Sequence, residues 1–230
     1  MKKYSKKYAA SLKKIDSAKV YEIAEAAKLV KETSVTKFDS TVDLAFRLNV
    51  DPTLADQLIR GTISLPHGNG KTKKVLALTM TKAQEAKDAG ADFVGGKEML
   101  EKITTENWFG FDVIVATPDM MGELGKMGRV LGPKGLMPNP KTGTVTMAIG
   151  NAVKEIKQGK ISYRVDKDGN LAMSIGRVSF DAKALEENIS AVCDHLAKSR
   201  PATVKGIFIH SAVIHTTMGP SIKITFAGRN

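Results

Sequence analysis

The stretch FDSTVDLAFRLNV, residues 38–50, alternates between two sets of side chains along most of its length. One set would lie on a single face of a strand: Phe38, Ser40, Val42, Leu44, Phe46 and Leu48. The residues between them are mostly charged or polar. Because successive side chains of a strand point to opposite sides of a sheet, the pattern predicts a long strand with one buried face. Asp51-Pro52 should end it, since proline has no N–H to donate to a sheet, and a short helix is expected around residues 54–59.

A different pattern follows the turn-rich segment LPHGNG, residues 65–70. Residues 75–80 (VLALTM) and 112–117 (DVIVAT) are almost continuously apolar, and a helical pattern at residues 82–89 ends at Gly90. Another helical pattern, at residues 148–158, ends at Gly159. Continuous apolar strands that alternate with helices are typical of a small parallel sheet covered on both faces.

Alternation returns after Gly159. Residues 161–165 and 171–175, separated by the turn sequence KDGN, predict a hairpin. Asp181 can cap a long helix, and residues 206–215 and 221–226 predict two closing strands. The predicted fold class is therefore α+β with an inserted α/β domain: domain I, an α+β sandwich, from residues 1–66 and 160–230, and domain II, a three-layer insert, from residues 67–159. A hinge is expected near residues 67–70 and 157–160.

Composition favours a polyanionic partner. The chain has 230 residues, and 35 basic against 24 acidic side chains give a formal net charge of +11. Such an excess attracts nucleic acid. We expect a cytoplasmic protein that does not enter a membrane, because the sequence has neither an apolar run of membrane-spanning length nor a signal-peptide core. Cys193 is the single cysteine, which excludes an intrachain disulfide, and we expect it to pack in the core.

The first fourteen residues are rich in lysine, with Tyr4 and Tyr8 between the lysines. The basic positions are Lys2, Lys3, Lys6, Lys7, Lys13 and Lys14. Two interpretations stay open: a solvated tail, or an arm whose lysines neutralise phosphates.

Catalytic motifs are weak. Gly70-Lys71-Thr72 resembles the end of a phosphate-binding P-loop, but Leu65 stands where that motif needs a glycine, and a strand rather than a helix should follow. The four histidines have no metal-ligand spacing, and the acidic residues Asp112, Asp119 and Glu123 form no paired motif. We therefore expect no enzyme, no catalytic residue, no metal and no cofactor. The alternatives are a nucleotide- or phosphate-using enzyme and a DNA-binding regulator.

Two glycine-containing segments are candidates for RNA contact. Residues 125–145, GKMGRVLGPKGLMPNPKTGTV, combine exposed backbone N–H groups with basic side chains, so they predict a loop that faces phosphate; the alternative is a solvated connection. The basic residues of this secondary loop are Lys126, Arg129, Lys134 and Lys141. Residues 216–221, TTMGPS, suit close packing on ribose, although an ordinary hairpin turn explains them equally well.

The motifs GPKGLMPNPKTGTV (residues 132–145), LPHGNGK, GADFVGG, ATPDMM and TTMGPS resemble those of the bacterial-type ribosomal protein L1 family, in order and spacing. The resemblance covers essentially the whole chain. It implies a Rossmann-like second domain and binding to 23S rRNA at the mobile stalk beside the tRNA exit site. It also implies help in releasing deacylated tRNA, and repression of translation from the messenger RNA of its own operon. The expected partners are thus this stalk, exit-site tRNA, the operon mRNA and other ribosomal components, with a monomer when free.

The same resemblance implies the RNA-facing residues, which would lie mainly in domain I. The positions that match the family are Lys37, Phe38, Thr41, Ser211, Thr217, Met218 and Gly219. Arg164 and Lys167, in the predicted hairpin, are further candidates for phosphate contact.

Overall fold

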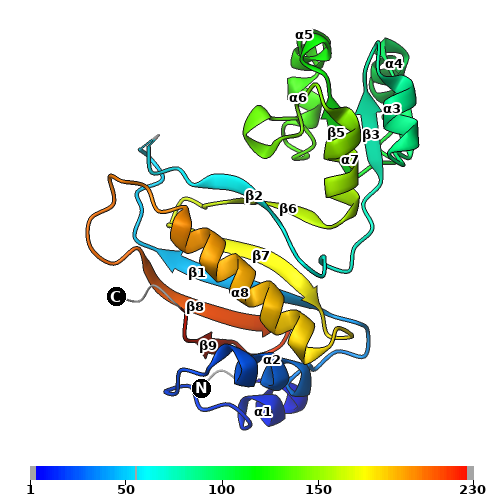
Figure 1. Cartoon of the computed structure of the whole chain (residues 1–230). Coiled ribbons are helices and arrows are strands. Elements are labelled where there is room, and N and C mark those ends of the chain that lie inside the picture. Colours follow the sequence, from blue (N-terminus) through cyan, green and yellow to red (C-terminus); the bar gives the residue numbers. More distant parts are fainter. Residues whose placement is uncertain (1–3, 55, 227–230) are drawn as a thin grey trace. The chain divides into compact units, whose positions relative to one another are not determined.

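The computed structural model describes residues 4–54 and 56–226 (Figure 1). The chain divides into two compact units: Met1–Gly70 with Ile161–Asn230, here called unit 1, and Lys71–Lys160, here called unit 2. The structure contains an antiparallel sheet, a parallel sheet and helices, so the expected α+β class is confirmed.

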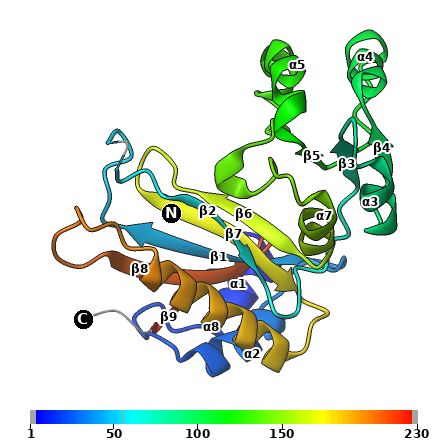
Figure 2. The same cartoon turned by 45° about the horizontal axis from the view of Figure 1, so that its top comes forward.

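Unit 1 is built on a four-stranded antiparallel sheet in the order β7-β1-β8-β9. The strands are β1 Thr41–Leu48, β7 Asn170–Arg177, β8 Ile209–Thr216 and β9 Ile222–Ile224. Helices α2 (Ile23–Glu32) and α8 (Ala182–Lys198) cover one face (Figures 1 and 2). Val42, Leu44, Phe46 and Leu48 are buried, which confirms the predicted alternation. The prediction is wrong at its start, because the strand begins three residues after Phe38 and Phe38 is 59% exposed.

The predicted hairpin is wrong in its pairing. The turn itself forms, with the Asp166 N–H donating to the Asn170 carbonyl at 2.9 Å. However, β6 (Lys160–Arg164) pairs with β2 (Arg60–Ser64) in a separate two-stranded sheet, whereas β7 pairs with β1. Alternation shows which face of a strand is buried but says nothing about its partner, and β1 offers β7 an edge of equal length.

The short helix expected around residues 54–59 does not form in the described residues; turns occupy the segment. The Asp51 side chain accepts hydrogen bonds from the N–H and hydroxyl of Thr53, at 3.0 and 2.6 Å. The Asp51 N–H donates to the Gln57 side chain at 2.9 Å. Such local side-chain bonds offer the backbone an alternative to helix, which explains the difference.

Of the lysine-rich N-terminal segment, Lys2 and Lys3 lie outside the described residues. The part that follows forms α1 (Lys6–Leu12), and the Ser5 hydroxyl caps it by accepting the Tyr8 N–H at 3.3 Å. The rings of Tyr4 and Tyr8 lie 5.0 Å apart. The predicted cap of α8 is at the right residue, Asp181, but its side chain makes no capping hydrogen bond.

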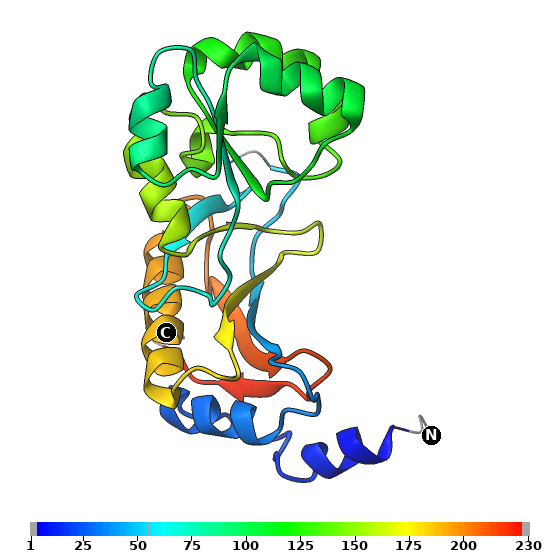
Figure 3. The ribbon, with the colours of Figure 1, turned by 90° about the vertical axis from the view of Figure 1, so that its right-hand side faces the viewer.

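Unit 2 contains a three-stranded parallel sheet in the order β4-β3-β5. Its strands are β3 Val75–Leu78, β4 Phe93–Gly95 and β5 Val113–Ala116. One apolar cluster joins the sheet to α3 (Ala83–Asp88) and α7 (Ile149–Lys157), and a second joins it to α4 (Lys97–Glu106), α5 (Met121–Lys126) and α6 (Gly128–Leu131). Helices therefore flank the strands on both faces (Figure 3). Two 3-10 turns, Pro118–Met120 and Pro140–Thr142, complete the unit.

The chain first passes from unit 1 to unit 2 after Gly70. The residues directly before this point, 67–70, are held within unit 1 by hydrogen bonds. The fully buried Asn188 side chain accepts the His67 N–H at 3.2 Å and donates to the Gly68 carbonyl at 3.0 Å. The Arg177 Nε donates to the Gly70 carbonyl at 3.3 Å. Gly68 and Gly70 both have positive φ, as does Gly159 before the return passage.

Candidate nucleic-acid interface

The face of the four-stranded sheet that lies away from α2 and α8 carries small and polar side chains. On β1 these alternate with the buried residues of the core. Across to β8, Asp43 pairs with His215, Ala45 with Val213, and Arg47 with Ser211. We call this surface the open face; its residues on β1, on β8 and directly after β8 are Thr41, Asp43, Ala45, Arg47, Ser211, Val213, His215 and Thr217. All of them are at least partly exposed, so the open face is available to a large ligand.

One end of the open face is formed by the turn that joins β8 to β9. The Thr217 N–H donates to the Thr41 carbonyl at 3.1 Å, which extends the ladder of β1 and β8 by one step. The Gly219 N–H donates to the Thr216 carbonyl at 2.8 Å and closes the turn. Between them, Met218 has φ of +62° and a side chain that is 75% exposed. A non-glycine residue in the left-handed region is strained, and here the strain presents an apolar side chain to solvent.

Gly219 has a structural reason to be glycine. A Cβ at this position would overlap the Thr216 hydroxyl, which is buried under the turn. That hydroxyl has no hydrogen-bond partner among the described residues. The structure therefore gives Gly219 the role of shaping the turn that displays Met218.

Lys37 and Phe38 precede β1 at the same end of the sheet. The next residue, Asp39, is fixed: its carboxylate accepts the Ser179 N–H at 3.0 Å and the Ser179 hydroxyl at 2.9 Å. Arg177 donates to the Asp39 carbonyl at 3.0 Å. These bonds hold the segment while the side chains of Lys37 and Phe38 stay exposed. This end of the open face thus combines exposed apolar side chains with a cation and two threonine hydroxyls.

Ser211 lies at the other end. Thr217 comes six positions after Ser211, just beyond the end of β8, which corresponds to roughly 20 Å of extended chain. Arg164 ends β6, and Lys167 lies in the turn before β7; both are exposed. The RNA-facing residues that were predicted in domain I therefore form two groups, one at each end of the open face, and not one cluster.

Arg47 is a candidate that the sequence reasoning did not select. It pairs with Ser211 on one side and with Asn170 on the other, and its side chain is exposed. The signal was present, because the alternation that buries Phe46 and Leu48 places Arg47 on the polar face.

The segment of unit 2 that was predicted to be a loop is partly helical: Lys126 ends α5, and Arg129 lies in α6. Lys126 pairs with Glu123 at 2.9 Å, and the Lys134 ammonium lies 4.1 Å from the centre of the Phe109 ring. The Asn139 side chain accepts the Lys141 N–H at 2.8 Å. Hydrogen bonds from Lys126 and Lys97 hold the pKa of Glu123 below its usual value. The four basic side chains of this loop, including Arg129, remain exposed on an ordered segment.

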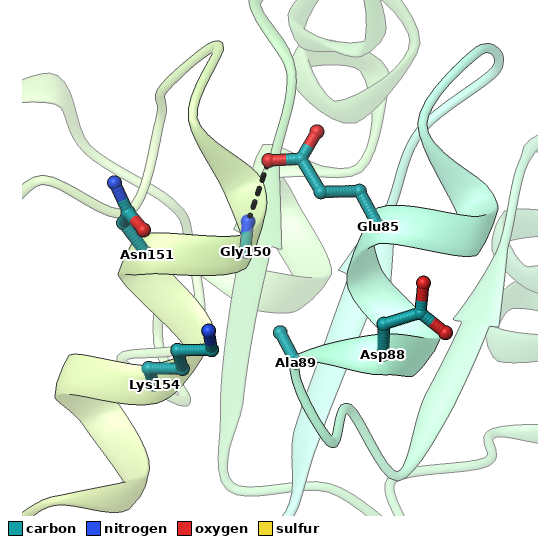
Figure 4. Close-up of a pocket in the computed structure, with 6 residues that line it drawn as sticks. All are labelled: Glu85, Asp88, Ala89, Gly150, Asn151 and Lys154. Carbon is teal, nitrogen blue, oxygen red and sulfur yellow. Dashed lines mark hydrogen bonds between the residues drawn. The ribbon is translucent and has the colours of Figure 1, made fainter.

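A shallow pocket of about 360 Å³ between α3 and α7 is lined by the acidic side chains of Glu85 and Asp88 and by Lys154 (Figure 4). The Glu85 carboxylate accepts the Gly150 N–H of the first turn of α7 at 3.3 Å, so it acts as a helix cap. The Asp88 carboxylate accepts from Gln84 at 3.0 Å. Both carboxylates are thus engaged in structural contacts.

Other chemically active side chains also have structural contacts. His67 Nε2 lies within hydrogen-bond distance of the Glu187 carboxylate, and His195 is 2.9 Å from the Tyr163 hydroxyl. Cys193 is buried as expected, and burial raises the pKa of its thiol to about 12. Within residues 4–54 and 56–226, no group of three or more His, Cys, Asp or Glu side chains is arranged to hold a metal ion. None of the helices in these residues is long and apolar enough to cross a membrane.

Comparisons with known proteins agree with the sequence motifs. The profile described as the ribosomal protein L1p/L10e family matches residues 30–220. A protein of Mycoplasma capricolum named large ribosomal subunit protein uL1 is 56% identical over 226 residues, which cover 98% of this chain and 100% of that protein. A protein of Mesoplasma florum with the same name is 58% identical over 224 residues, 97% of this chain and 99% of its own length.

Proposed function

Because the chain belongs to the ribosomal protein L1p/L10e family, we propose that it is a structural constituent of the large ribosomal subunit that binds 23S rRNA at the mobile stalk. Two relatives are named as large ribosomal subunit proteins, and the similarity to this chain extends over almost their whole length. As part of the ribosome it would act in the cytoplasm, and its function requires binding and no catalysis.

The observation that carries the proposal is the turn at the end of the open face. The backbone of Thr217 is fixed to β1, and the Met218 side chain is exposed at positive φ, so an apolar contact is prepared before any ligand arrives. Rigid presentation lowers the entropy lost on binding. Phe38 and Met218 would pack on bases or ribose, while the hydroxyls of Thr41 and Thr217 would reach 2′-hydroxyl groups, which both donate and accept.

We propose recognition of folded RNA by shape, with a salt-dependent contribution from basic side chains. An RNA that spans the open face would contact both groups of residues, about 20 Å apart along β8. Lys37 at one end and Arg47, Arg164 and Lys167 at the other would neutralise phosphates. The net charge of +11 adds a long-range attraction that is not specific to sequence.

For the two units we propose different roles. Unit 1 would be the main rRNA-binding domain, and unit 2 a Rossmann-like insert whose basic loop meets exit-site tRNA and helps deacylated tRNA to leave. The passages between the units would act as a hinge. Since Gly68 and Gly70 are fastened by Asn188 and Arg177, the first flexible point would lie after Gly70.

We also propose that the free, monomeric protein represses translation of its own operon mRNA through the same open face. One surface that serves two RNAs makes their binding mutually exclusive. Excess rRNA stalk should therefore displace the mRNA site from the protein.

The test is equilibrium binding of the purified protein to the stalk fragment of 23S rRNA and to a scrambled RNA of equal length, across a salt series. We expect a preference for the stalk of about 10³ or more at physiological salt, a ratio typical of specific recognition. Equal affinity for the two RNAs would overturn the proposal. Duplex DNA of equal length, as a competitor, distinguishes a DNA-binding regulator.

The alternative of a nucleotide-using enzyme has its own test. A ligand that binds the folded state must raise apparent thermal stability. The thermal unfolding midpoint is measured with and without millimolar nucleoside mono- and triphosphates. A midpoint that rises as the nucleotide fills a site in unit 2 would support the enzyme alternative.

A further inference from the structure

A shallow pocket of about 390 Å³ lies in unit 1, where β6 leads into the turn before β7. Its lining residues are Pro52, Leu58, Arg164, Val165, Asp166 and Lys167. The Val165 N–H donates to the Ile59 carbonyl at 3.1 Å, which fixes the segment that carries Leu58 against the end of β6. The volume is at the lower end of the range of about 300–1,000 Å³ in which small ligands bind.

The walls of this pocket are apolar, and its rim is cationic. Val165 is buried, Pro52 is half-buried and Leu58 is 37% exposed. Arg164 and Lys167 are exposed, and in the part of the chain that the structure describes neither side chain has a hydrogen-bond or ion-pair partner. Apolar walls with a few polar groups at the edge are the usual composition of a ligand site.

The single carboxylate at the pocket is directed into its own turn. Asp166 accepts the Asn170 N–H at 2.7 Å and the Asp168 N–H at 3.0 Å, and these bonds lower the pKa of Asp166. Its negative charge is therefore satisfied by backbone donors. The two cations are left to attract an anionic ligand.

The pocket adjoins the open face. Arg47 pairs with Ser211 in β8 and with Asn170 in β7, and the Leu48 N–H donates to the Gly169 carbonyl at 2.9 Å. The turn that carries Lys167 thus ends next to Arg47. The turn that lines the pocket therefore lies at the Ser211 end of the open face.

We propose that this pocket binds one unpaired nucleotide of the RNA, with the base against Leu58, Pro52 and Val165 and the phosphate between Arg164 and Lys167. The inference rests on the proposed RNA-binding function and adds a second subsite to it. A paired base is held inside its helix, so the ligand is a nucleotide from a bulge, a loop or an end of the RNA.

The first test uses adenosine 5′-monophosphate and inorganic phosphate as separate probes, with the methyl resonances of the full chain followed by NMR. We expect adenosine monophosphate to shift the signals of Leu58 and Val165 at millimolar concentration, and inorganic phosphate to leave them in place. Leu54, which is 50% exposed but does not line the pocket, is the internal control. Equal shifts with both probes would mean a simple anion site and would overturn the proposal, as would no shift with either.

The second test compares Leu58→Ala with Leu54→Ala in binding to the stalk fragment. Loss of the apolar wall should weaken binding about tenfold for Leu58→Ala, the order expected when a buried apolar contact is lost, and leave the affinity of Leu54→Ala unchanged. Arg164→Gln should weaken binding more than Lys183→Gln, which removes the same charge from α8. Circular dichroism confirms folding of each variant. If each variant of a pocket residue weakened RNA binding no more than its control variant, the proposed nucleotide site would be wrong.

The outcomes for the pocket and for the proposed function are distinguishable. If the wild-type protein does not prefer the stalk fragment to scrambled RNA, the proposed function fails, whatever the pocket does. The mononucleotide titration does not depend on the stalk, so it still decides whether the pocket accepts a base.

Discussion

The backbone N–H of Thr217 donates to the carbonyl oxygen of Thr41 at 3.1 Å, one step beyond the last residue of β8. The Thr217 hydroxyl is 3.5 Å from the same oxygen, at the limit of a hydrogen bond. The backbone therefore holds residue 217 in place, and its hydroxyl remains able to turn towards a ligand.

Replacement of Thr217 by valine should consequently separate binding from folding. We expect the affinity for the stalk fragment to fall by about 1–3 kcal/mol, the cost of leaving a buried polar partner unsatisfied. The midpoint of thermal unfolding should stay nearly constant. Thr203→Val, in an exposed turn of unit 1, is the matched control. Unchanged RNA affinity in Thr217→Val would show that the hydroxyl faces no RNA group.

Met218 should show opposite effects on stability and on binding. In the wild type, the backbone strain of Met218 at φ of +62° costs about 1–2 kcal/mol of folding stability. Met218→Gly removes this strain, but the glycine loses more backbone entropy on folding, which costs about 0.5–1 kcal/mol. The net free energy of unfolding should therefore stay constant or rise by up to about 1.5 kcal/mol. Affinity for the stalk should fall. Chemical denaturation and RNA binding on the same preparation check both signs; a stable variant with wild-type affinity would contradict a role for this side chain.

Replacement of Gly219 by a residue with a Cβ should destabilise the protein, because the turn has no space for that atom. Gly219→Ala pushes a methyl group into the Thr216 hydroxyl, and overpacking of this kind costs about 1–3 kcal/mol of stability. Gly122→Ala is the control, because nothing lies near its Cβ and the residue is within α5, where alanine should stabilise the helix by about 0.8–1.0 kcal/mol. Urea denaturation distinguishes the two. Equal stability of Gly219→Ala and the wild type would mean that the turn can open.

The sequence predicted the positions of strands and helices better than it predicted which strands pair with each other. Alternation in residues 41–48 identified β1 and its buried face, because side-chain period depends only on local backbone geometry. The pairing of β7 with β1 depends on contacts far apart in the chain, and the hairpin prediction failed for that reason. The strand Phe93–Gly95 was missed, since three residues are too few to show a period.

For the candidate site, the sequence could name residue types but could not give their spacing. Resemblance selected Ser211 and Thr217 together, and only the register of β8 shows that they lie at opposite ends of the open face. A register shift between Arg47 and Leu48 further changes which residues face outward near Ser211. Arg47 was overlooked because its importance comes from its neighbours across the sheet, Asn170 and Ser211.

In the described part of the lysine-rich N-terminal segment, Lys6 and Lys7 lie in α1 and Lys13 and Lys14 lie in the turn that follows it, and this permits a defined test of the segment's role. Neutralising Lys6, Lys7, Lys13 and Lys14 to glutamine should reduce the slope of log affinity against log salt, by about 0.9 for each phosphate that the variant no longer neutralises. The ratio of stalk to scrambled RNA affinity should change little. Four lysines replaced on α3, α4, α7 and α8 (Lys87, Lys102, Lys154 and Lys183) form the control with equal net charge. A fall in the ratio without a change of slope would show that the segment reads RNA structure.

The folding stability of the protein should depend on pH through Cys193, and the burial of its thiol determines the direction of this dependence. Desolvation raises the pKa of its thiol from an ordinary 9.0 to about 12, and the charge of Asp194 adds to the shift. The folded state therefore holds the proton more tightly than the unfolded state. The stabilisation is fully present below pH 9.0 and is lost as pH rises towards about 12. Denaturant titrations of the wild type and Cys193→Ala across this window should show that the wild type loses more stability, and thiol labelling at neutral pH should require unfolding. If the two proteins lost stability in parallel, or if the folded wild type were labelled rapidly, the thiol would be accessible and its burial in α8 would be wrong.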